Sequence, residues 1–354
     1  MEVSNASPPS FVSEPRSGHH EHQKAINLGL FLDRYKDKFA ALRKEKGWMG
    51  ENLYMYQGFW YRSNNAHALS VETNAHALSV ETTMAMQDNL QSHSTDIYLI
   101  TQPKSGTTWV KALMFATVNR AKYKTNSLST HPLLISNPHN FVPFIEQEFL
   151  SKTPTYVQES SPRLFSTHLP YTSLPQSILD AGCRLVYLCR NPKDVMVSWF
   201  YFSNKFTHIN LSPMTMEEMF EAFIKGMMPY GPYWDHVKEY YKISSEHPTR
   251  ILFLTYEVLK MDTSNQVKRL AEFMGYPFTK LEETEGVVEE IVRLCSLENL
   301  KEVNKHGNYR EGVPNAVFFR NGEVGDWRND LTPEMSQILD DITKEKFQGL
   351  DISF

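Results

Sequence analysis

Cysteine is scarce in this chain, and its three residues, Cys183, Cys189 and Cys295, form no CxxC pair. A disulfide framework or a cysteine-based zinc site needs more thiols at closer spacing, so neither is expected. Few, odd-numbered thiols are typical of reduced cysteines, which predicts a cytoplasmic location. The opening residues Met1–Asn5 include neither a basic cluster nor an apolar run, so no secretory signal is expected.

Long apolar runs and a basic excess are also missing. No run approaches the roughly 20 apolar residues that cross a bilayer, so no membrane span is predicted. Lys plus Arg number 36 against 41 Asp plus Glu, which gives a formal net charge of −5. A general nucleic-acid binder would carry a basic excess, so this class is excluded, whereas a local pocket for a small anion is not. The chain is 41% hydrophobic, enough for a sizeable core.

Composition changes along the chain predict a disordered tail and one domain. Residues 1–25 are rich in Ser, Pro and His, which predicts disorder, and residues 26–354 form the domain. Aromatic residues cluster at Tyr54–Tyr61. This cluster has two open interpretations: aromatic side chains docked onto the core, or one wall of an apolar ligand pocket.

A short tandem duplication follows the aromatic cluster. Residues Asn65–Thr73 read NAHALSVET, and Asn74–Thr82 repeat them without change. Two copies are too few and too short for a solenoid, so we interpret them as an insertion in a surface segment. The histidines His67 and His76 have no neighbours that complete a metal-ligand set.

Short apolar strands alternate with helical stretches from about residue 96 onward. The predicted strands are Ile97–Thr101, Arg163–His168, Cys183–Arg190 and Arg250–Tyr256. The predicted helices are Val110–Asn119, Asp194–Phe206 and one that ends near Met274. This alternation is typical of an α/β fold with a central parallel sheet and helices on both faces. Ligands bind at the carboxyl ends of such strands, so chemistry is expected just after each one.

The loop after the first strand has the composition of a phosphate cradle. Gly106 permits a tight turn, Thr107 and Thr108 begin a helix whose free N–H groups attract anions, and Lys104 adds a charge. It is not a Walker A loop, because Lys104 precedes the glycine. The alternative is an ordinary strand-to-helix turn capped by Thr107.

Further polar residues follow the other strands. Arg190 ends the third strand, with Ser198 two turns into the next helix, and Tyr256 ends the fourth. Arg190 is suited to grip a phosphate, although an ion pair with Asp194 is an open alternative. Near the C-terminus, Arg320 and Gly322 form a second candidate anion clamp. Several such elements favour a ligand with more than one phosphate group.

His168 closes the second strand and is the candidate general base. An unperturbed histidine pKa of ~6.5 suits it to accept a proton near neutral pH. A buried structural histidine is the alternative, since the chain has 13 histidines.

Three motifs in order resemble those of the cytosolic sulfotransferases. They are Pro103–Trp109, Tyr187–Val195 with Ser198-Trp199, and Arg320–Trp327. The stretches Asn137–Pro143 and Phe165–Tyr171 resemble the plant branch of this family. The resemblance extends from about Trp48 to Phe347, nearly the whole chain.

The resemblance implies 3′-phosphoadenosine 5′-phosphosulfate (PAPS) as co-substrate, no metal, and a single α/β domain, 26–354, related to P-loop nucleotide kinases. His168 would be the general base, and Lys104 would act in both binding and catalysis. The implied donor-binding residues are Lys104, Ser105, Gly106, Thr107, Thr108 and Trp109 for the 5′-phosphosulfate and adenine, Arg190, Ser198, Arg320, Asn321 and Gly322 for the 3′-phosphate, and Tyr256, Cys295, Ser296 and Leu297 near the adenosine.

The sequence departs from the family pattern at four places. Asn321 replaces a usual Lys, and Leu297 replaces a frequent aromatic residue. Thr332-Pro333 interrupts the usual dimer motif, so we expect a monomer or a weak homodimer. The duplication, 65–82, falls where relatives have a helix beside the acceptor pocket.

The predicted activity is sulfuryl transfer from PAPS to a hydroxyl of a small acceptor, which yields a sulfate ester and PAP, adenosine 3′,5′-bisphosphate. The resemblance suggests flavonoids, brassinosteroids, hydroxyjasmonates or desulfoglucosinolates, and we favour a phenol or a hydroxyjasmonate. The alternatives are a small-molecule kinase and a catalytically degenerate nucleotide-binding protein. The missing Walker lysine argues against the first, and the presence of Lys104 and His168 argues against the second.

Deletion of one copy of the repeat, Asn74–Thr82, should change acceptor KM or preference while PAP affinity stays the same. The reason is its position before the phosphate loop and beside the aromatic cluster. Steady-state kinetics over an acceptor panel and titration with PAP measure the two effects. An unchanged acceptor profile would show that the repeat is only a surface insertion.

Overall fold

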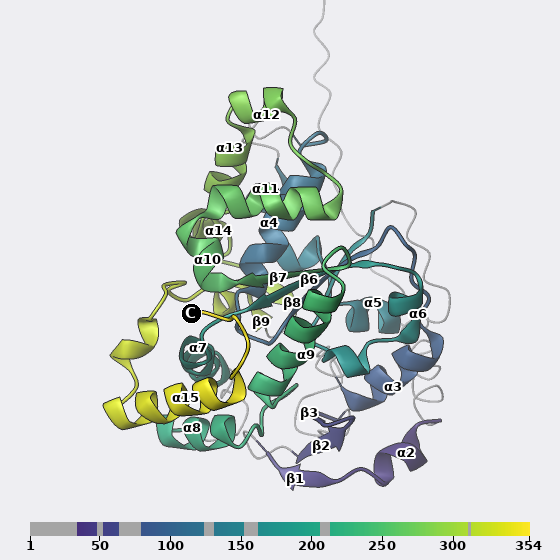
Figure 1. Cartoon of the computed structure of the whole chain (residues 1–354), viewed down its shortest axis with the longest axis vertical. Coiled ribbons are helices and arrows are strands. Elements are labelled where there is room, and N and C mark those ends of the chain that lie inside the picture. The colour runs from purple at the N-terminus through teal and green to yellow at the C-terminus, as the bar shows by residue number, and fades with distance from the viewer. Residues whose placement is uncertain are drawn as a thin grey trace, which may run out of the picture.

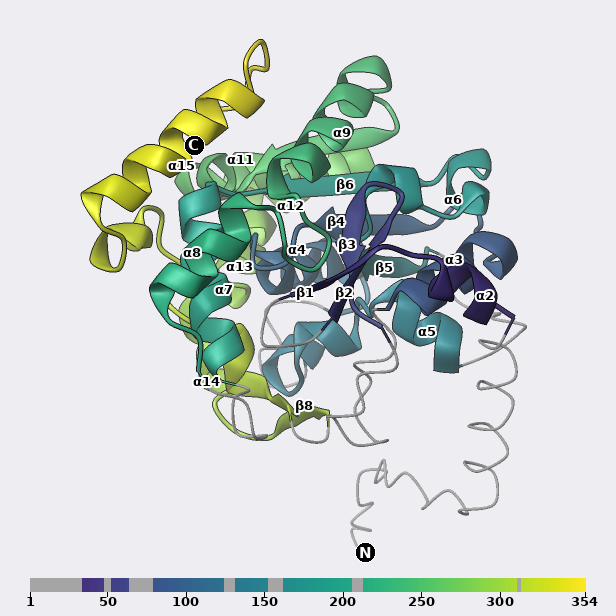
Figure 2. The ribbon, with the colours of Figure 1, turned by 90° about the horizontal axis from the view of Figure 1, so that it is seen from below.

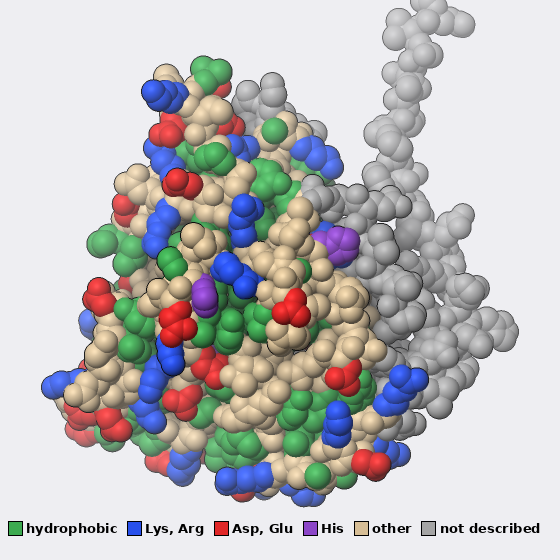
Figure 3. All heavy atoms as spheres, turned by 45° about the vertical axis from the view of Figure 1, so that its right-hand side comes forward, with side chains coloured by type: hydrophobic (Ala, Val, Ile, Leu, Met, Phe, Trp, Pro, Cys, Tyr) green, Lys and Arg blue, Asp and Glu red, His purple; other side chains and the backbone are tan. Residues whose placement is uncertain are grey.

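The computed structural model describes residues 34–47, 52–63, 79–123, 131–151, 162–205, 213–310 and 313–354. The predicted tail, 1–25, and most of the duplication lie outside these residues. Within the described ranges, no helix combines the length and the apolar character that a membrane span requires. Figure 3 shows acidic and basic side chains intermixed over the described part of one face, as the near-balanced charge predicts.

The centre of the fold is a parallel sheet of four strands, as predicted (Figure 1). The strands are β4 (Ile97–Thr101), β5 (Leu164–Thr167), β6 (Arg184–Cys189) and β7 (Ile251–Thr255), in the order β5-β4-β6-β7. Each strand lies within its predicted range. All pairings are parallel, so the carboxyl ends of the four strands meet at one edge.

Alternate side chains of each strand enter two separate cores, one on each face of the sheet. From β4, Tyr98 and Ile100 belong to one core, whereas Ile97 and Leu99 belong to the other. Because successive strand residues point to opposite faces, a strand covered on both sides must be apolar throughout, as β4 is. The sequence therefore encodes a sheet buried between two helical layers.

Helices cover both faces of the sheet (Figures 1 and 2). The first core includes residues of α3 (Val80–Asn89), α5 (Ile145–Ser151), α6 (Gln176–Asp180), α7 (Pro192–Asn204), α8 (Met216–Ile224), α9 (Tyr233–Glu246) and α15 (Pro333–Lys346). The second includes residues of α4 (Thr107–Asn119), α10 (Tyr256–Met261), α11 (Thr263–Met274), α13 (Val287–Leu294) and α14 (Leu297–Val303). The remaining helices are α2 (Lys36–Ala40), α12 (Lys280–Thr284) and the short 3-10 helices Pro132–Leu134, Pro138–Asn140, Tyr171–Ser173, Asn315–Phe318 and Asp326–Asn329.

Helix boundaries differ from the predicted ones where local chemistry extends or interrupts a helix. α4 begins at Thr107 rather than Val110, because Gly106 serves as its N-cap. α7 begins at Pro192 rather than Asp194, since the Asn191 side chain accepts from Lys193 N and Pro192 is tolerated in the first turn. The single helix expected to end near Met274 is two helices, interrupted at Asp262, whose φ and ψ of −138° and 62° are not helical.

The aromatic cluster forms a small antiparallel sheet of β1 (Lys44–Lys46), β2 (Asn52–Tyr56) and β3 (Phe59–Tyr61). The turn between β2 and β3 has positive φ at Gln57 and Gly58, as in a type I′ hairpin. All three residues of β3 are at most 4% exposed, and the Tyr61 hydroxyl donates to Ser173 Oγ at 2.7 Å. For these three residues, the structure favours docking onto the core.

The last strand pair is β8 (Asn308–Arg310) with β9 (Val313–Pro314).

The end of the duplication forms the start of α3. Ser79 is the N-cap, and its buried Oγ accepts from Thr82 N at 3.2 Å. The two copies have the same sequence, so a chain that lacks either copy still has this Ser-Val-Glu-Thr segment directly before Thr83. The nine extra residues therefore lengthen the connection from β3 to α3 without removing the cap.

We expect Ser79→Ala to lower the free energy of unfolding by about 0.5–2 kcal/mol, the usual cost of a lost N-cap. Deletion of one copy should change it by less, because loop-closure entropy depends only weakly on loop length. Chemical denaturation of the three proteins measures both effects. A larger loss for the deletion than for Ser79→Ala would show that the extra copy packs against the domain.

Candidate functional site

The loop between β4 and α4 is built as an anion cradle. Gly106 has a φ of +111°, and a Cβ at this position would lie 2.7 Å from Tyr256 Cδ2, so only glycine fits. The first N–H groups of α4 have no partner within the helix and carry its positive dipole end. The Ser105 hydroxyl is buried, and no described residue hydrogen-bonds its Oγ. These are the features that a bound phosphate would satisfy.

Two threonine hydroxyls at the start of α4 lie within hydrogen-bond distance of other side chains. Thr107 Oγ1 lies 2.7 Å from Thr101 Oγ1, and Thr108 Oγ1 lies 3.1 Å from His139 Nε2. A hydroxyl that accepts one hydrogen bond keeps its own proton for another acceptor. A threonine that accepts in one of these contacts can therefore donate to an anion at the helix terminus.

Lys104 is a half-buried cation with no described carboxylate paired to it. Its Nζ lies 3.7 Å from the centre of the Phe202 ring. Burial, together with the charges of Lys205, Arg320 and Arg190, lowers the pKa of Lys104 to about 7. Such a concentration of positive charge around Lys104 favours the binding of a negatively charged ligand.

Arg190 and Arg320 come from distant parts of the chain, and both lie near enough to Lys104 for their charges to lower its pKa. Arg190 Nη2 donates to Glu323 O at 2.7 Å and lies 3.5 Å from Asp194 Oδ2, so the predicted alternative of an Asp194 ion pair is present. Arg320 pairs with Asp326 through Nη1. The Nε of each arginine is buried and has no partner among the described residues. A second phosphate group would satisfy both donors, so the site fits a ligand with two phosphate groups.

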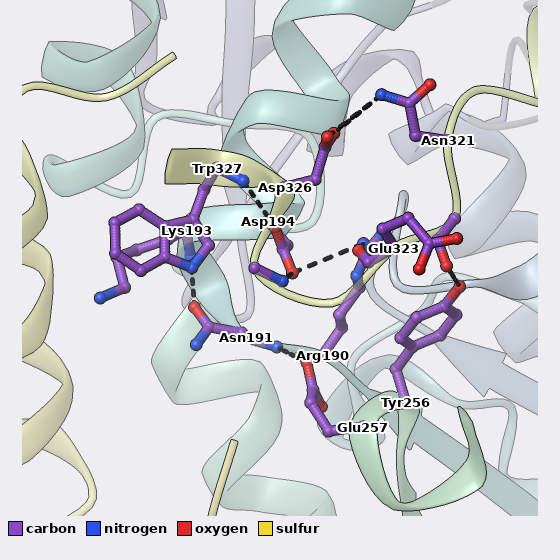
Figure 4. A network of polar contacts seen from close by, with 12 residues as sticks. Arg190, Asn191, Lys193, Asp194, Tyr256, Glu257, Asn321, Glu323, Asp326 and Trp327 are labelled. Atoms are coloured by element: carbon purple, nitrogen blue, oxygen red, sulfur yellow. Dashed lines mark hydrogen bonds and ion pairs between the residues drawn. The ribbon is translucent and has the colours of Figure 1, made fainter. Parts of the chain in front are cut away.

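Asp194 has a second role in this site, beyond the ion pair with Arg190 that the sequence analysis considered. Its carboxylate accepts from Gly325 N at 2.9 Å and from Trp327 N at 3.0 Å (Figure 4). The Lys193 ammonium lies 3.8 Å from the centre of the Trp327 ring. These contacts hold the segment 320–327 against α7. The only sequence signal was the position of Asp194 in the first turn of a helix after a strand.

Asn321 and Gly322 have different surroundings within that segment. Figure 4 shows the Asn321 side chain directed toward Asp326, where its Nδ2 donates at 3.1 and 3.3 Å. The Gly322 carbonyl accepts from the Tyr256 hydroxyl at 2.7 Å. A Cβ on Gly322 would lie 2.6 Å from Leu297 Cδ2. Gly322 therefore permits close packing, and Asn321 already has an acidic partner.

The other predicted donor-binding residues lie in the same region with one exception. Trp109 packs edge-on against Tyr256, with ring centres 5.4 Å apart, and Ser198 is half-buried on α7 without a hydrogen bond to a described residue. Ser296 caps α14 by accepting from Asn299 N at 3.2 Å. Cys295 is fully buried in the core, so its backbone rather than its side chain is the part that a ligand could approach.

His168 has one nitrogen held and one available. Its Nδ1 lies 2.7 Å from the Thr101 carbonyl oxygen, which can only accept, so Nδ1 carries the proton and Nε2 keeps a lone pair. No described residue hydrogen-bonds Nε2. The His168 carbonyl in turn lies 3.1 Å from His236 Nε2. This geometry orients His168 as a proton acceptor.

The surroundings keep His168 neutral. It is 8% exposed, and burial lowers its pKa to about 3 despite the opposing hydrogen bond to Thr101. The rings of Phe144 and Tyr230 lie 4.8 and 5.7 Å from its ring. Above that pKa the imidazole is uncharged, so the free base is present throughout the neutral range. Among the described residues, no group of three or more His, Cys, Asp or Glu converges as metal ligands would.

Together these features place candidate anion-binding groups and an oriented histidine at one edge of the sheet, as a site for transfer of an anionic group requires. A sulfotransferase domain family matches residues 94–351. Cytosolic sulfotransferase 13 of Arabidopsis thaliana is 42% identical over 90% of this chain and 93% of its own length. Cytosolic sulfotransferase 1 of the same plant is 44% identical over 91% and 92% of the two chains.

Solved structures agree with these matches. A crystal structure of an Arabidopsis thaliana sulphotransferase has a TM-score of 0.67 and 34% identity, covering 98% of this chain and 100% of its own. The mouse sulfotransferase SULT7A1, complexed with PAP, has a TM-score of 0.62 and 26% identity, covering 84% and 95%. The chain belongs to the plant cytosolic sulfotransferase family. It is a PAPS-dependent sulfotransferase with a P-loop-like α/β fold.

We expect PAP binding to take up a proton at Lys104. The pKa of free Lys104 is lowered to about 7, and anionic oxygens raise it again because they stabilise the ammonium form. At pH 8 this amounts to most of one proton per PAP bound. Calorimetric titration at pH 8 in buffers with different ionisation enthalpies measures it. The phosphates of PAP, with a second pKa of roughly 6, contribute little at this pH.

Lys104→Met is the matched control, since it keeps the length of the side chain and removes the titrating group. It should bind PAP more weakly and without proton uptake. Apparent enthalpies that are equal in all buffers for the wild-type protein would contradict the lowered pKa of Lys104.

Proposed function

We propose that this enzyme transfers the sulfuryl group of PAPS to the hydroxyl of a small phenolic or hydroxyjasmonate-like acceptor. The observation that carries the proposal is the geometry of His168, a neutral base with an available Nε2 at the same sheet edge as Lys104. PAPS supplies an activated sulfur whose bond to the 5′-phosphate oxygen breaks as the acceptor oxygen bonds to it. The products are a sulfate ester and PAP.

In this proposal, each end of the donor has its own set of residues. Lys104, Ser105, Gly106, Thr107 and Thr108 hold the 5′-phosphosulfate, and Trp109 lies against the adenine. The 3′-phosphate is held by Arg190, Ser198 and the segment Arg320–Gly322, while Tyr256, Cys295, Ser296 and Leu297 lie near the adenosine. The unpaired Ser105 Oγ, Arg190 Nε and Arg320 Nε support this division.

His168 Nε2 accepts the proton of the acceptor hydroxyl, and the Lys104 ammonium stabilises charge on the leaving phosphate oxygen. The Thr101 carbonyl holds the imidazole in the tautomer that this step needs. The main contributions are correct placement of the reacting groups and stabilisation of charge that develops in the transition state.

The surroundings of His168 support a phenol over an aliphatic alcohol. A base with a pKa near 3 is weak, so it serves best for a hydroxyl that is already acidic. A phenol, with a pKa of roughly 10 as in tyrosine, needs less help than an aliphatic alcohol. The rings of Phe144 and Tyr230 beside the imidazole are also suited to stacking on a flat acceptor.

The two alternatives from the sequence are set aside. A small-molecule kinase disagrees with the family assignment. A degenerate nucleotide-binding protein would need neither an oriented base nor an unpaired Lys104. We further propose one sulfotransferase domain over 26–354, a monomer or weak homodimer, and a cytosolic location like that in the relatives' names.

A PAPS-dependent assay over simple phenols, flavonoids, brassinosteroids, hydroxyjasmonates and desulfoglucosinolates tests the proposed acceptor, with products identified by mass spectrometry. We expect the highest kcat/KM for a phenolic hydroxyl. A clear preference for brassinosteroids or desulfoglucosinolates would overturn the acceptor class while the sulfuryl transfer itself stands.

We expect His168→Ala to lower kcat by ~10²–10⁴ and to leave PAP affinity nearly intact, because a general base acts only in the reaction. Arg190→Ala is the contrasting variant and should mainly weaken PAP binding, since the 3′-phosphate does not react. Single-turnover kinetics and PAP titration separate the two effects. More than a tenth of wild-type kcat in His168→Ala would contradict its role as the base.

A further inference from the structure

A fully buried lysine lies directly beneath the phosphate loop. Lys111 is 0% exposed on α4, and its Nζ lies 2.8 Å from His139 Nδ1 and 3.7 Å from the centre of the Phe144 ring. Burial of an ammonium group is costly unless it is well paired. The His139 imidazole and the Phe144 ring are among the groups that contact this ammonium, and the buried carboxylate of Glu146 lies near enough to interact with its charge.

His139 connects this lysine to the loop. It lies in the 3-10 helix Pro138–Asn140, where its backbone N donates to Asn137 Oδ1 at 3.0 Å, and it is 3% exposed. The rings of Phe318 and Phe144 pack against it at 4.4 and 5.5 Å. Its Nε2 lies 3.1 Å from Thr108 Oγ1, so the held ring bridges Lys111 and Thr108.

The chemistry of these three groups sets the direction of the hydrogen bonds. An ammonium can only donate, so His139 Nδ1 must accept from Lys111. Its Nε2 then carries the ring proton and donates to Thr108 Oγ1. With one lone pair engaged, the Thr108 hydroxyl directs its own proton to another acceptor. Without the lysine charge, the imidazole could take the other tautomer and turn the hydroxyl around.

We propose that Lys111 and His139 are positioning residues, which hold the Thr108 hydroxyl as a hydrogen-bond donor to the donor's 5′-phosphate. This inference rests on the proposed placement of the 5′-phosphosulfate at Lys104–Trp109. Thr108 is in the first turn of α4, where the helix N–H groups already favour an anion. The direction of the hydrogen bond at Thr107 is not fixed in this way, because its partner is the Thr101 hydroxyl, which can donate or accept.

The test compares PAP with adenosine 3′-phosphate, which lacks the 5′-phosphate. The Kd of adenosine 3′-phosphate divided by the Kd of PAP, both measured by calorimetry, reports the contribution of that phosphate. Thr108→Val and His139→Phe should each lower the ratio about tenfold, the cost of a hydrogen bond to a charged group. Affinity for adenosine 3′-phosphate should stay within about threefold of wild type, which a general structural defect would not spare.

Two further variants make the result specific. His139→Gln offers an acceptor oxygen and an N–H donor at a spacing like that of the two ring nitrogens, so it should restore the ratio to within about threefold of wild type. The double variant Thr108→Val with His139→Phe should lose no more than either single variant, because both remove the same hydrogen bond. If His139→Phe fails to fold, Lys111→Met replaces it, with the same expected loss.

The outcomes separate this inference from the proposed function. An unchanged ratio in Thr108→Val would place the 5′-phosphate elsewhere and overturn the proposed donor site together with the inference. A lowered ratio in Thr108→Val with a wild-type ratio in His139→Phe and Lys111→Met would overturn the inference alone. Additive losses in the double variant, or equal losses in His139→Gln and His139→Phe, would also overturn it, because neither agrees with an oriented hydroxyl.

Discussion

The Asp194 carboxylate joins parts of the chain that are more than a hundred residues apart, and the donor site depends on it. Its two oxygens accept from Gly325 N and Trp327 N, 131 and 133 residues further along. These bonds bring the segment that carries Arg320 to the end of β6, where Arg190 begins the turn into α7. Hydrogen bonds from backbone N–H groups to a charged carboxylate are stronger than hydrogen bonds between neutral groups, so they fix this loop firmly. The loop in turn presents Glu323 O to Arg190, so the two halves of the clamp hold each other.

Around this junction, the protein keeps several polar groups incompletely paired. Ser105 Oγ, Arg190 Nε and Arg320 Nε are buried without described partners, and Lys104 has a lowered pKa. Such groups cost stability in the free protein, because each has lost water without gaining a full partner. A ligand with phosphate groups at both ends restores those interactions. This arrangement supports the proposal that a chain with net negative charge binds a highly anionic donor at these groups.

The proposed base, His168, needs an oriented lone pair rather than a charge. The Thr101 carbonyl holds His168 Nδ1, and burial keeps the ring neutral. Burial also weakens it as a base, so the proposed reaction would rely on an acidic acceptor hydroxyl and on cations near the leaving group. In that proposal the end of β4 would serve both substrates, because Thr101 orients His168 and the loop that follows would receive the donor.

Local sequence patterns were sufficient for the sheet and for much of the site. Apolar runs with short lengths predicted the four strands, and the geometry of parallel sheets brought Lys104, His168, Arg190 and Tyr256 to one edge. Resemblance to a known family added PAPS as the donor and Asn321 as a further member of the predicted clamp of Arg320 and Gly322. These predictions depend either on residues that are neighbours in the sequence or on the edge where the carboxyl ends of parallel strands meet.

Only the tertiary structure decided which distant groups meet. The contact between the Asn321 amide and Asp326 had no signal in the sequence. The contacts of Asp194 with the segment 320–327, and those between His139 and Lys111, were not predicted either, because these partners come from other elements. The break at Asp262 and the tautomer of His168 likewise depend on backbone geometry and on a neighbouring strand. The periodicity of apolar residues determines which face of an element a residue occupies, whereas the pairing of polar atoms depends on which distant elements the fold brings together.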